Sequence, residues 1–317
     1  MISEKYGKVI KGLGGLFSVR VKEESGEVNI YNCRAKGSLH KDEEKLLVGD
    51  NVVITIDTET PDSIVISEIS ERKNALIRPP MANLDYLFIV FAAKRPNPVL
   101  EVVDKLIAIA IHNNITPVAV ITKQDLSGSL AEEYEALYRS VGIDTFVTSS
   151  ENGEGVSELK KYINERIKDG VTAAFAGASG VGKSTLMNAL FRGLQLSTNE
   201  ISKRIERGRH TTRHVEIFDV RGNEGGEGHL ADTPGFSLVD FARFDFFELD
   251  DLISTFPDIT PYAKGCAYSD CSHVGEGAEE CAVARAAKEG KIRESRLQSY
   301  RSIYIILKEK KKISKKT

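Results

Sequence analysis

Residues 177–184, GASGVGKS, have the types and spacing of a loop that binds phosphate groups. They fit the pattern G-x-x-x-x-G-K-[ST], in which backbone N–H groups surround the phosphates at a helix N-terminus. Lys183 is expected to bridge the terminal phosphates and to assist catalysis, and the Ser184 hydroxyl to ligate Mg²⁺. The nucleotide-contacting residues expected in this loop are Gly177, Ala178, Ser179, Gly180, Val181, Gly182, Lys183, Ser184 and Thr185.

The segments on either side of this loop favour a ligand site. VTAAFA, residues 171–176, is short and apolar, as is typical of a strand. STLMNALF, residues 184–191, has helical spacing, with Leu186, Ala189 and Leu190 on one side. A glycine-rich turn without a ligand is the alternative, and the strand–loop–helix context that the motif requires weighs against it.

Residues 119–126, AVITKQDL, end in a pattern suited to recognition of guanine. Asp125 can accept hydrogen bonds from the guanine N1 and exocyclic amine, whereas adenine offers no such pair of donors and would leave the carboxylate unpaired. Thr122 and Lys123 are expected to contact the nucleotide as well. The usual motif begins with Asn, so the shorter Thr122 hydroxyl predicts fewer contacts and weaker affinity, with selectivity kept by Asp125. Taken alone, the pattern also fits solvated loop residues after a strand.

Three further segments belong to the same known set of GTPase elements. They are the SAK-like loop VTSSENGEGVSEL (147–159) with Ser149 and Ser150, the candidate switch I ERGRHTTRHVE (206–216) with Thr211 and Thr212, and the D-x-x-G element HLADTPGF (229–236) with Asp232 and Gly235. Asp232 is expected to hold Mg²⁺ through water, beside the candidate ligands Ser184 and Thr212, and the Gly235 amide to sense the γ-phosphate. Because so many elements of one set occur together, the sequence predicts a GTPase that binds GTP and GDP.

The order of these elements along the chain is unusual. The base motif at 122–125 precedes the phosphate loop at 177–184, whereas an ordinary GTPase begins with the phosphate loop. Joining the ends of the fold and reopening it elsewhere produces this order, and domain termini commonly lie close enough together to allow it. The sequence therefore predicts a circularly permuted domain in which the chain after the D-x-x-G element is attached directly to a switch.

Length and composition set limits on the architecture. The chain has 317 residues with 41% hydrophobic content, which predicts two or three domains with real cores. The sequence has no apolar run of the roughly 20 residues that a membrane helix needs, and its N-terminus lacks the apolar segment of a signal peptide. We expect a soluble, cytoplasmic, monomeric protein that does not contact a membrane.

Residues 1–72 are predicted to form a small β domain. Short β-rich runs such as GEVNIYNCRAKG and GDNVVITID alternate with glycines and turn residues, which suits an OB-type barrel of about five strands. An SH3-like barrel or a simpler β module is the alternative, and Cys33 is expected to be a core or strand residue. The segment holds ten Lys and Arg against thirteen Asp and Glu, so any basic face must be local.

Residues 253–317 contain a candidate metal site. Cys266, Cys271, His273 and Cys281 have the spacing C-x4-C-x-H-x7-C, and three thiolates with one imidazole form a closed, structural Zn²⁺ set. We expect one zinc ion per chain; reduced loop cysteines or a disulfide are the alternative. The remainder is predicted to be helical and ends in the basic tail KEKKKISKKT, either solvated or in contact with phosphate.

A β-barrel, a permuted GTPase and a Cys/His segment in this order resemble the bacterial small-ribosomal-subunit biogenesis GTPases, the RsgA/YjeQ family. RPPMANLDYLFIVFA, residues 78–92, also resembles the family's entry into the permuted domain. The resemblance implies a multidomain α/β protein: an OB-fold barrel (1–72), a permuted P-loop GTPase domain (73–252) and a helical zinc-binding domain (253–317). It further implies GTP hydrolysis stimulated by the 30S subunit in late maturation, with 16S rRNA contacts through the two outer domains.

The residue that follows the D-x-x-G element bears on turnover. Phe236 occupies the position of the water-orienting Gln of many GTPases and cannot hydrogen-bond water, which predicts slow hydrolysis by the isolated protein. The resemblance places His210 in switch I as the candidate for ordering the water, and an exposed loop role is the alternative. Two other functions stay open: a permuted GTP-binding switch for a non-ribosomal RNA or protein partner, and a nucleotide-binding regulator with negligible turnover.

Overall fold

The computed structural model describes residues 2–37, 39, 45–57, 64–167, 170–191, 215–221, 227–232 and 240–314. The chain divides into two compact units, each assembled from segments that are distant in the sequence. The first contains residues 1–86, 160–175 and 190–236, and the second contains residues 87–159, 176–189 and 237–317.

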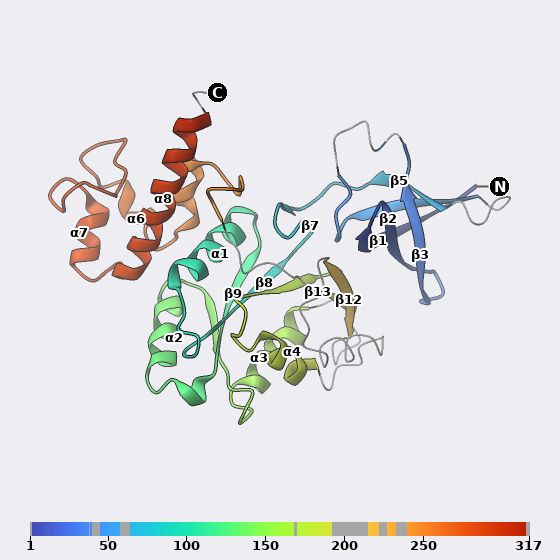
Figure 1. The fold of residues 1–317 in the computed structure, drawn as a ribbon, viewed down its shortest axis with the longest axis horizontal. Coiled ribbons are helices and arrows are strands. Elements are labelled where there is room, and N and C mark those ends of the chain that lie inside the picture. The colour runs from blue at the N-terminus through green and yellow to red at the C-terminus, as the bar shows by residue number, and fades with distance from the viewer. Residues whose placement is uncertain are drawn as a thin grey trace. The chain divides into compact units, whose positions relative to one another are not determined.

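The N-terminal part of the first unit is a closed five-stranded barrel (Figure 1). Its strands are β1 (Ile2–Leu13), β2 (Leu16–Lys22), β3 (Val28–Ala35), β4 (Asn51–Asp57) and β5 (Ile64–Ile69). They follow the order β1-β2-β3-β5-β4, and an antiparallel pairing of β1 with β4 closes the barrel. This confirms the barrel predicted for the N-terminal segment.

Alternation along these strands sends one set of side chains inward. The buried barrel core consists of Val9, Val19, Val21, Cys33, Val52, Ile54 and Ile66. These are mostly β-branched residues, which pack well on a pleated surface. Cys33 is a fully buried member of this core, in agreement with the expectation from the sequence.

The sheet continues from the barrel into a hairpin of the same unit. Strand β12 (Glu216–Arg221) pairs antiparallel with β13 (Glu227–Asp232), and β13 pairs in parallel with β11 (Thr172–Ala176). Strand β12 also meets the barrel strand β1, where Lys11 is opposite Glu216. A small separate sheet is formed by β6 (Ala75–Leu76) and β7 (Met81–Ala82). The barrel and the hairpin are therefore joined by backbone pairing.

The second unit contains three neighbouring strands with helices around them. The strands are β8 (Tyr86–Ala92), β9 (Thr116–Thr122) and β10 (Asp144–Val147), and β10 pairs in parallel with β9. The helical elements are α1 (Leu100–His112), the short 3-10 helix η1 (Gln124–Leu126), α2 (Leu130–Ser140), α3 (Val156–Arg166) and α4 (Lys183–Phe191), the last two of which extend from one unit into the other. Strand β8 is almost continuously buried, as expected of a strand covered on both faces.

The C-terminal part of this unit is helical. It comprises η2 (Leu249–Thr255), α6 (Thr260–Ala263), α7 (Ala282–Lys288) and the long helix α8 (Glu294–Ser314), which packs against α1 and η2. Most of the predicted basic tail is the end of α8. Lys310 pairs with Asp245 at 2.6 Å, and Lys311 pairs with Asp250 at 2.8 Å. Both acidic partners are 80% exposed, so these are surface ion pairs within the same unit, and contact of the tail with phosphate stays a prediction.

A buried arginine joins α8 to α1. Arg296 is fully buried, and its guanidinium donates to Asp104 at 2.6 Å and to both oxygens of Asp258 at 2.9 and 3.2 Å. Burial opposes the charge of Arg296, but the two carboxylates outweigh it and raise the pKa above its ordinary value. Removing one partner of such a buried ion pair strongly destabilises the fold, because the remaining charge is left uncompensated.

None of the helices in the described ranges is long and apolar enough to cross a lipid bilayer.

Candidate nucleotide site and metal centre

The predicted phosphate loop connects a buried strand to a helix. Every residue of β11 is buried, and α4 begins at Lys183. A Cβ at Gly177 would collide with the Val90 carbonyl oxygen, and Gly180 and Gly182 have φ values of 79° and 93°. Glycine is favoured at these positions because the backbone approaches closely or adopts the left-handed region. The strand–loop–helix context expected from the flanks is present.

The loop offers polar groups to solvent at its helical end. Ala178, Ser179 and Gly180 are exposed, and so are Ser184 and Thr185 in the first turn of α4. The Lys183 ammonium lies 3.4 Å from the carbonyl oxygen of Gly177, across the loop. Backbone N–H groups at a helix N-terminus next to a lysine form a suitable site for phosphate.

The base motif lies against this loop. The Thr122 hydroxyl donates to the Val181 carbonyl at 2.5 Å, and the Lys123 ammonium donates to the Gly180 carbonyl at 2.8 Å. Lys123 also donates to the carbonyl of Arg95 and has a left-handed φ of 59°. Two motifs in reversed order along the chain therefore meet in one site.

Thr122 retains a contact with the phosphate loop despite its short side chain. It is buried, and its hydroxyl lies 3.3 Å from the Phe91 carbonyl in addition to the closer Val181 oxygen. A hydroxyl has one proton to donate, so it serves one of these carbonyls at a time. An Asn amide carries two N–H donors, so Thr122 makes fewer contacts than Asn would, which is the reason for the weaker GTP affinity expected from the sequence.

The SAK-like loop supports the carboxylate that is expected to read the base. Ser149 is fully buried, and its hydroxyl donates to Asp125 at 2.7 Å. The Gln124 amide donates to the Thr148 carbonyl at 3.2 Å, which adds a backbone link. We predicted contact between Ser149 and the nucleotide, but not its contact with Asp125. A serine two residues after the end of a strand that neighbours the base-motif strand was the available signal. Ser150 is half-buried in the same loop.

Several predicted site residues lie outside the described residues. These are His210, Thr211, Thr212, Gly235 and Phe236. The backbone of Asp232 is described as the last residue of β13, opposite Glu216 in the hairpin. The roles assigned to these residues stay predictions.

The four candidate metal ligands lie together in the second unit. The ligand atoms of Cys266, Cys271, His273 and Cys281 are all within 4.8 Å of one another. The Cys266 and Cys281 sulfurs are 3.9 Å apart, and each lies 3.5 Å from His273 Nδ1. A tetrahedral ion with metal–sulfur bonds of about 2.3 Å separates two sulfurs by roughly 3.8 Å, so this donor set fits a metal ion.

Contacts around the cluster hold the ligand loop in shape. His273 has a left-handed φ of 61°, and its carbonyl accepts a hydrogen bond from Arg301 of α8 at 2.9 Å. Glu276 accepts hydrogen bonds from Ser272 and from the backbone of Val274 and Gly275. Burial opposes its charge, but these donors outweigh burial and lower the pKa of Glu276 to about 2. Outer contacts of this kind orient metal ligands.

A phosphate loop met by a base motif that precedes it in the chain defines a circularly permuted P-loop GTPase. Residues 69–242 match the RsgA GTPase family, and residues 6–64 match the RsgA N-terminal domain. The chain belongs to the RsgA GTPase family, whose members hydrolyse GTP.

Relatives and solved structures extend the similarity over nearly the whole chain. The small ribosomal subunit biogenesis GTPase RsgA of Geobacillus thermodenitrificans (strain NG80-2) is 40% identical over 309 residues, covering 96% of this chain and 98% of the relative. The crystal structure of YjeQ from Thermotoga maritima matches with a TM-score of 0.74 and 31% identity, covering 96% of this chain and 99% of that one. YloQ, described as a circularly permuted GTPase, matches with a TM-score of 0.72 and 30% identity, covering 97% and 96%.

Proposed function

We propose that this GTP hydrolase acts in biogenesis of the small ribosomal subunit and that the 30S particle stimulates its turnover during late maturation. The observation that carries the nucleotide site is the contact of Thr122 and Lys123 with the phosphate loop. The ribosomal role is supported by full-length similarity to relatives that carry this function in their names.

The site residues have separate roles in GTP hydrolysis. Asp125, held by Ser149, reads guanine, and the phosphate loop with Lys183 surrounds the phosphates. Ser184, Thr212 and Asp232 would hold Mg²⁺, which neutralises charge on the β- and γ-phosphates when bound. His210 orders the attacking water, because Phe236 cannot.

The metal centre takes one Zn²⁺ ion in a structural role. The Cys266, Cys271, His273 and Cys281 set leaves no open position for a substrate, and its sulfur and nitrogen donors suit zinc. Metal binding contributes on the order of 10 kcal/mol to the folding of such small modules. We propose residues 253–317 as this zinc-binding domain, 73–252 as the GTPase domain and 1–72 as the barrel.

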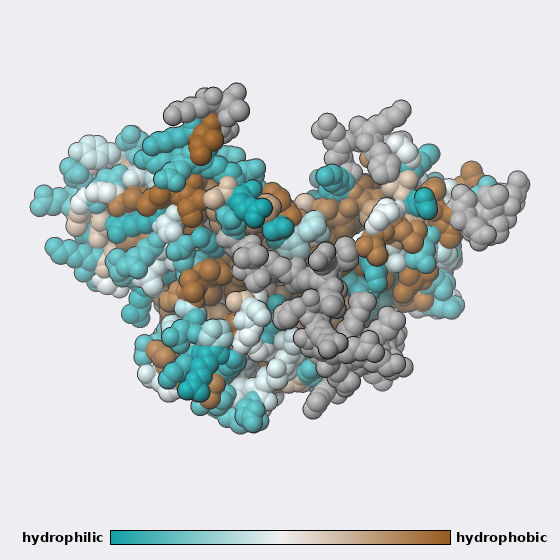
Figure 2. All heavy atoms as spheres, viewed as in Figure 1, coloured by the Kyte–Doolittle hydropathy of each residue, from teal (hydrophilic) through white to brown (hydrophobic). Residues whose placement is uncertain are grey.

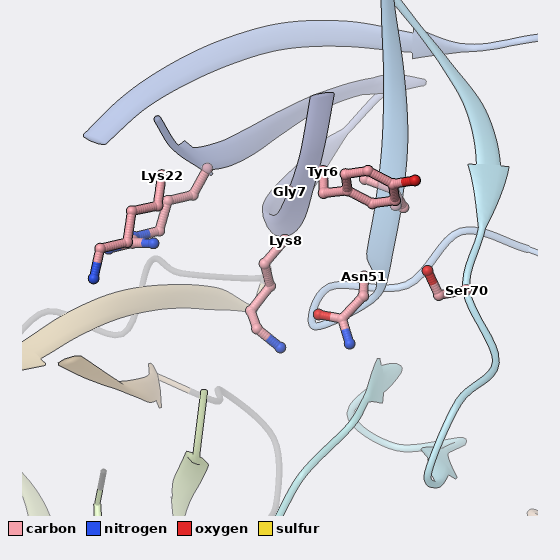
Figure 3. Close-up of a pocket in the computed structure, with 8 residues that line it drawn as sticks. Tyr6, Gly7, Lys8, Lys22, Asn51 and Ser70 are labelled. Carbon is pink, nitrogen blue, oxygen red and sulfur yellow. The ribbon is translucent and has the colours of Figure 1, made fainter. Parts of the chain in front are cut away.

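The barrel carries a pocket suited to an RNA backbone. A cavity of about 290 Å³ is lined by Tyr6, Gly7, Lys8, Arg20, Lys22, Asn51, Val52 and Ser70 (Figure 3). Lys8 is about nine-tenths buried, and burial lowers its pKa to about 8. Tyr6 lines the same pocket as Lys8 and is 77% exposed, and exposed aromatic rings with cations are the groups that bind single-stranded RNA.

Other apolar side chains of the barrel reach solvent. They are Ile2, Leu13, Leu16 and Ile30, and Figure 2 shows hydrophobic residues at the surface of this part of the molecule. Exposed apolar groups on the barrel support a macromolecular partner for it. We propose 16S rRNA as that partner, with a second contact from the zinc-binding domain.

The deciding experiment measures phosphate release from GTP and ATP by the full chain, with and without 30S subunits. The proposed function predicts hydrolysis of GTP only, slow alone and strongly stimulated by 30S at low salt. Unchanged turnover on adding 30S would favour a switch with a non-ribosomal partner. No detectable turnover with 30S, alongside tight GTP binding, would favour a regulator.

A further inference from the structure

One arginine of the barrel contacts both strands of the hairpin in the first unit. Arg20, on β2, donates to Asp219 of β12 at 2.6 Å and to Glu227 of β13 at 2.9 Å. The side chains are 9% exposed for Arg20 and 14% exposed for each carboxylate. Water and salt screen largely buried ion pairs little, and removal of one partner leaves the other charge buried and uncompensated.

Further polar contacts link the barrel to the β12–β13 hairpin. His229 of β13 is buried, and its Nδ1 lies 3.0 Å from Asp219. Burial opposes the charge of Asp219, but the hydrogen bonds from His229 and Arg20 outweigh it and lower its pKa below the ordinary value. Lys22 lies 3.4 Å from Glu227, and Lys11 of β1 pairs with Glu216 at 3.1 Å. The barrel thus holds the hairpin by side chains as well as by the pairing of β1 with β12.

The position of the hairpin in the chain makes this connection relevant to catalysis. Strand β12 begins at Glu216, the last residue of the segment predicted to contain switch I, and β13 ends at Asp232, the first residue of the D-x-x-G element. Any displacement of β12 against β13 therefore changes the distance between Glu216 and Asp232, from which the chain leads into the predicted switch I and D-x-x-G segments.

We propose that Arg20 is a positioning residue for GTP hydrolysis. It fixes the β12–β13 hairpin to the barrel, and contacts made by the barrel thereby affect the predicted switch I and D-x-x-G segments. The inference rests on the proposed function only in its use of 30S as the stimulating partner. Arg20 suits this role because one planar guanidinium can donate to two carboxylates at once, which a lysine ammonium cannot do with the same geometry.

The experiment measures kcat and KM for GTP with and without 30S for wild type, Arg20→Met, Arg20→Lys and Glu227→Gln. Arg20→Met is expected to lower the 30S-stimulated kcat about tenfold or more, since small misplacements of catalytic groups cost up to about 10² in rate. KM for GTP is expected to stay within about twofold, because the nucleotide-binding groups are intact. Arg20→Lys and Glu227→Gln are expected to give intermediate losses.

The matched control is Lys5→Met, which removes an ion pair of 2.6 Å to Glu23; among the described residues, the Lys5 ammonium contacts Glu23 and Tyr31, both in the barrel. It is expected to keep the wild-type ratio of stimulated to basal kcat. If Arg20→Met does not fold, Arg20→Lys and Glu227→Gln decide the matter. A wild-type ratio in every folded variant at the Arg20 contacts would overturn the inference, as would an equal loss in Lys5→Met.

An error in the proposed function can be distinguished from an error in the role of Arg20. If 30S does not stimulate the wild type, the partner is wrong, and amide hydrogen exchange in the free protein tests the connection alone. Arg20→Met is then expected to speed exchange in β12 and β13, whereas Lys5→Met is not. Unchanged exchange in the hairpin would overturn the positioning role independently of any ribosomal partner.

Discussion

The Thr122 hydroxyl lies 2.5 Å from the carbonyl oxygen of Val181, a residue 59 positions further along the chain. This hydrogen bond joins the base motif to the phosphate loop across a reversed sequence order. The three-dimensional contact is thus compatible with the permuted connectivity, because it depends on where the strands end and not on which segment comes first.

Replacing Thr122 tests how much this contact contributes to affinity. Thr122→Val keeps the volume but removes the donor, so it is expected to cost about 1–2 kcal/mol and to weaken GTP binding about tenfold. Thr122→Asn is expected to bind GTP at least as tightly as the wild type, because an amide supplies two donors. Isothermal titration with GTP measures both, and equal affinity of wild type and Thr122→Val would contradict the prediction.

Selectivity for guanine is expected to depend on Asp125. Asp125→Asn should shift preference from GTP toward XTP, whose 2-oxo group accepts a hydrogen bond where guanine donates one. Competition binding with GTP, XTP and ATP is the measurement. Ser149→Ala serves as the companion variant: it frees Asp125 from its 2.7 Å hydrogen bond and should weaken GTP binding without favouring XTP. Equal wild-type affinity for ATP and GTP would show that Asp125 does not read the base.

Zinc is expected to copurify at one ion per chain. Cys271→Ser removes one of four ligands and should abolish stoichiometric zinc and unfold the C-terminal segment locally, because metal binding stabilises the loop. Elemental analysis and limited proteolysis measure the two effects. Cys33→Ser is the control, since Cys33 is buried in the barrel core and should leave the zinc content unchanged. Metal-free wild-type protein prepared without chelators would refute the assignment.

Lys8 is expected to reduce stability at neutral pH. Burial lowers its pKa from 10.5 to about 8, so the unfolded chain binds more protons between these values and stability should rise with pH across that window. Below pH 8 both states are charged and the cost is complete. Lys8→Met should therefore raise the free energy of unfolding by about 1–3 kcal/mol at pH 7, with a smaller gain at pH 10. Urea unfolding at both pH values measures this, and a gain independent of pH would contradict it.

His210 is expected to supply catalysis that Phe236 cannot. His210→Ala should remove most of the 30S-stimulated rate and leave GTP affinity nearly intact, whereas Lys183→Ala should weaken binding as well. The stimulation available to a GTPase completed by a partner is about 10³–10⁵ in rate, so a large loss is measurable by phosphate release. His214→Ala, in the same segment, is the matched control. A full stimulated rate in His210→Ala would remove this histidine from the mechanism.

Much of the candidate site was predictable because its signals are local. The glycines of the phosphate loop, the four metal ligands and the strand-ending base motif each occupy a short stretch whose spacing is set by backbone geometry and ligand chemistry. The barrel followed from alternating β-rich runs, since side-chain direction alternates along a strand.

Other relationships were decided by tertiary packing alone. Three of them join residues that are distant in the sequence. These are the hydrogen bond from Ser149 to Asp125, the burial of Arg296 between Asp104 and Asp258, and the ion pairs of Arg20 with the hairpin. In the sequence, Arg296 looks like an ordinary solvated residue of a basic helix. Charged residues have no local signal for burial, because what holds them is a partner brought close only when separate segments pack, and that arrangement is a property of the whole fold.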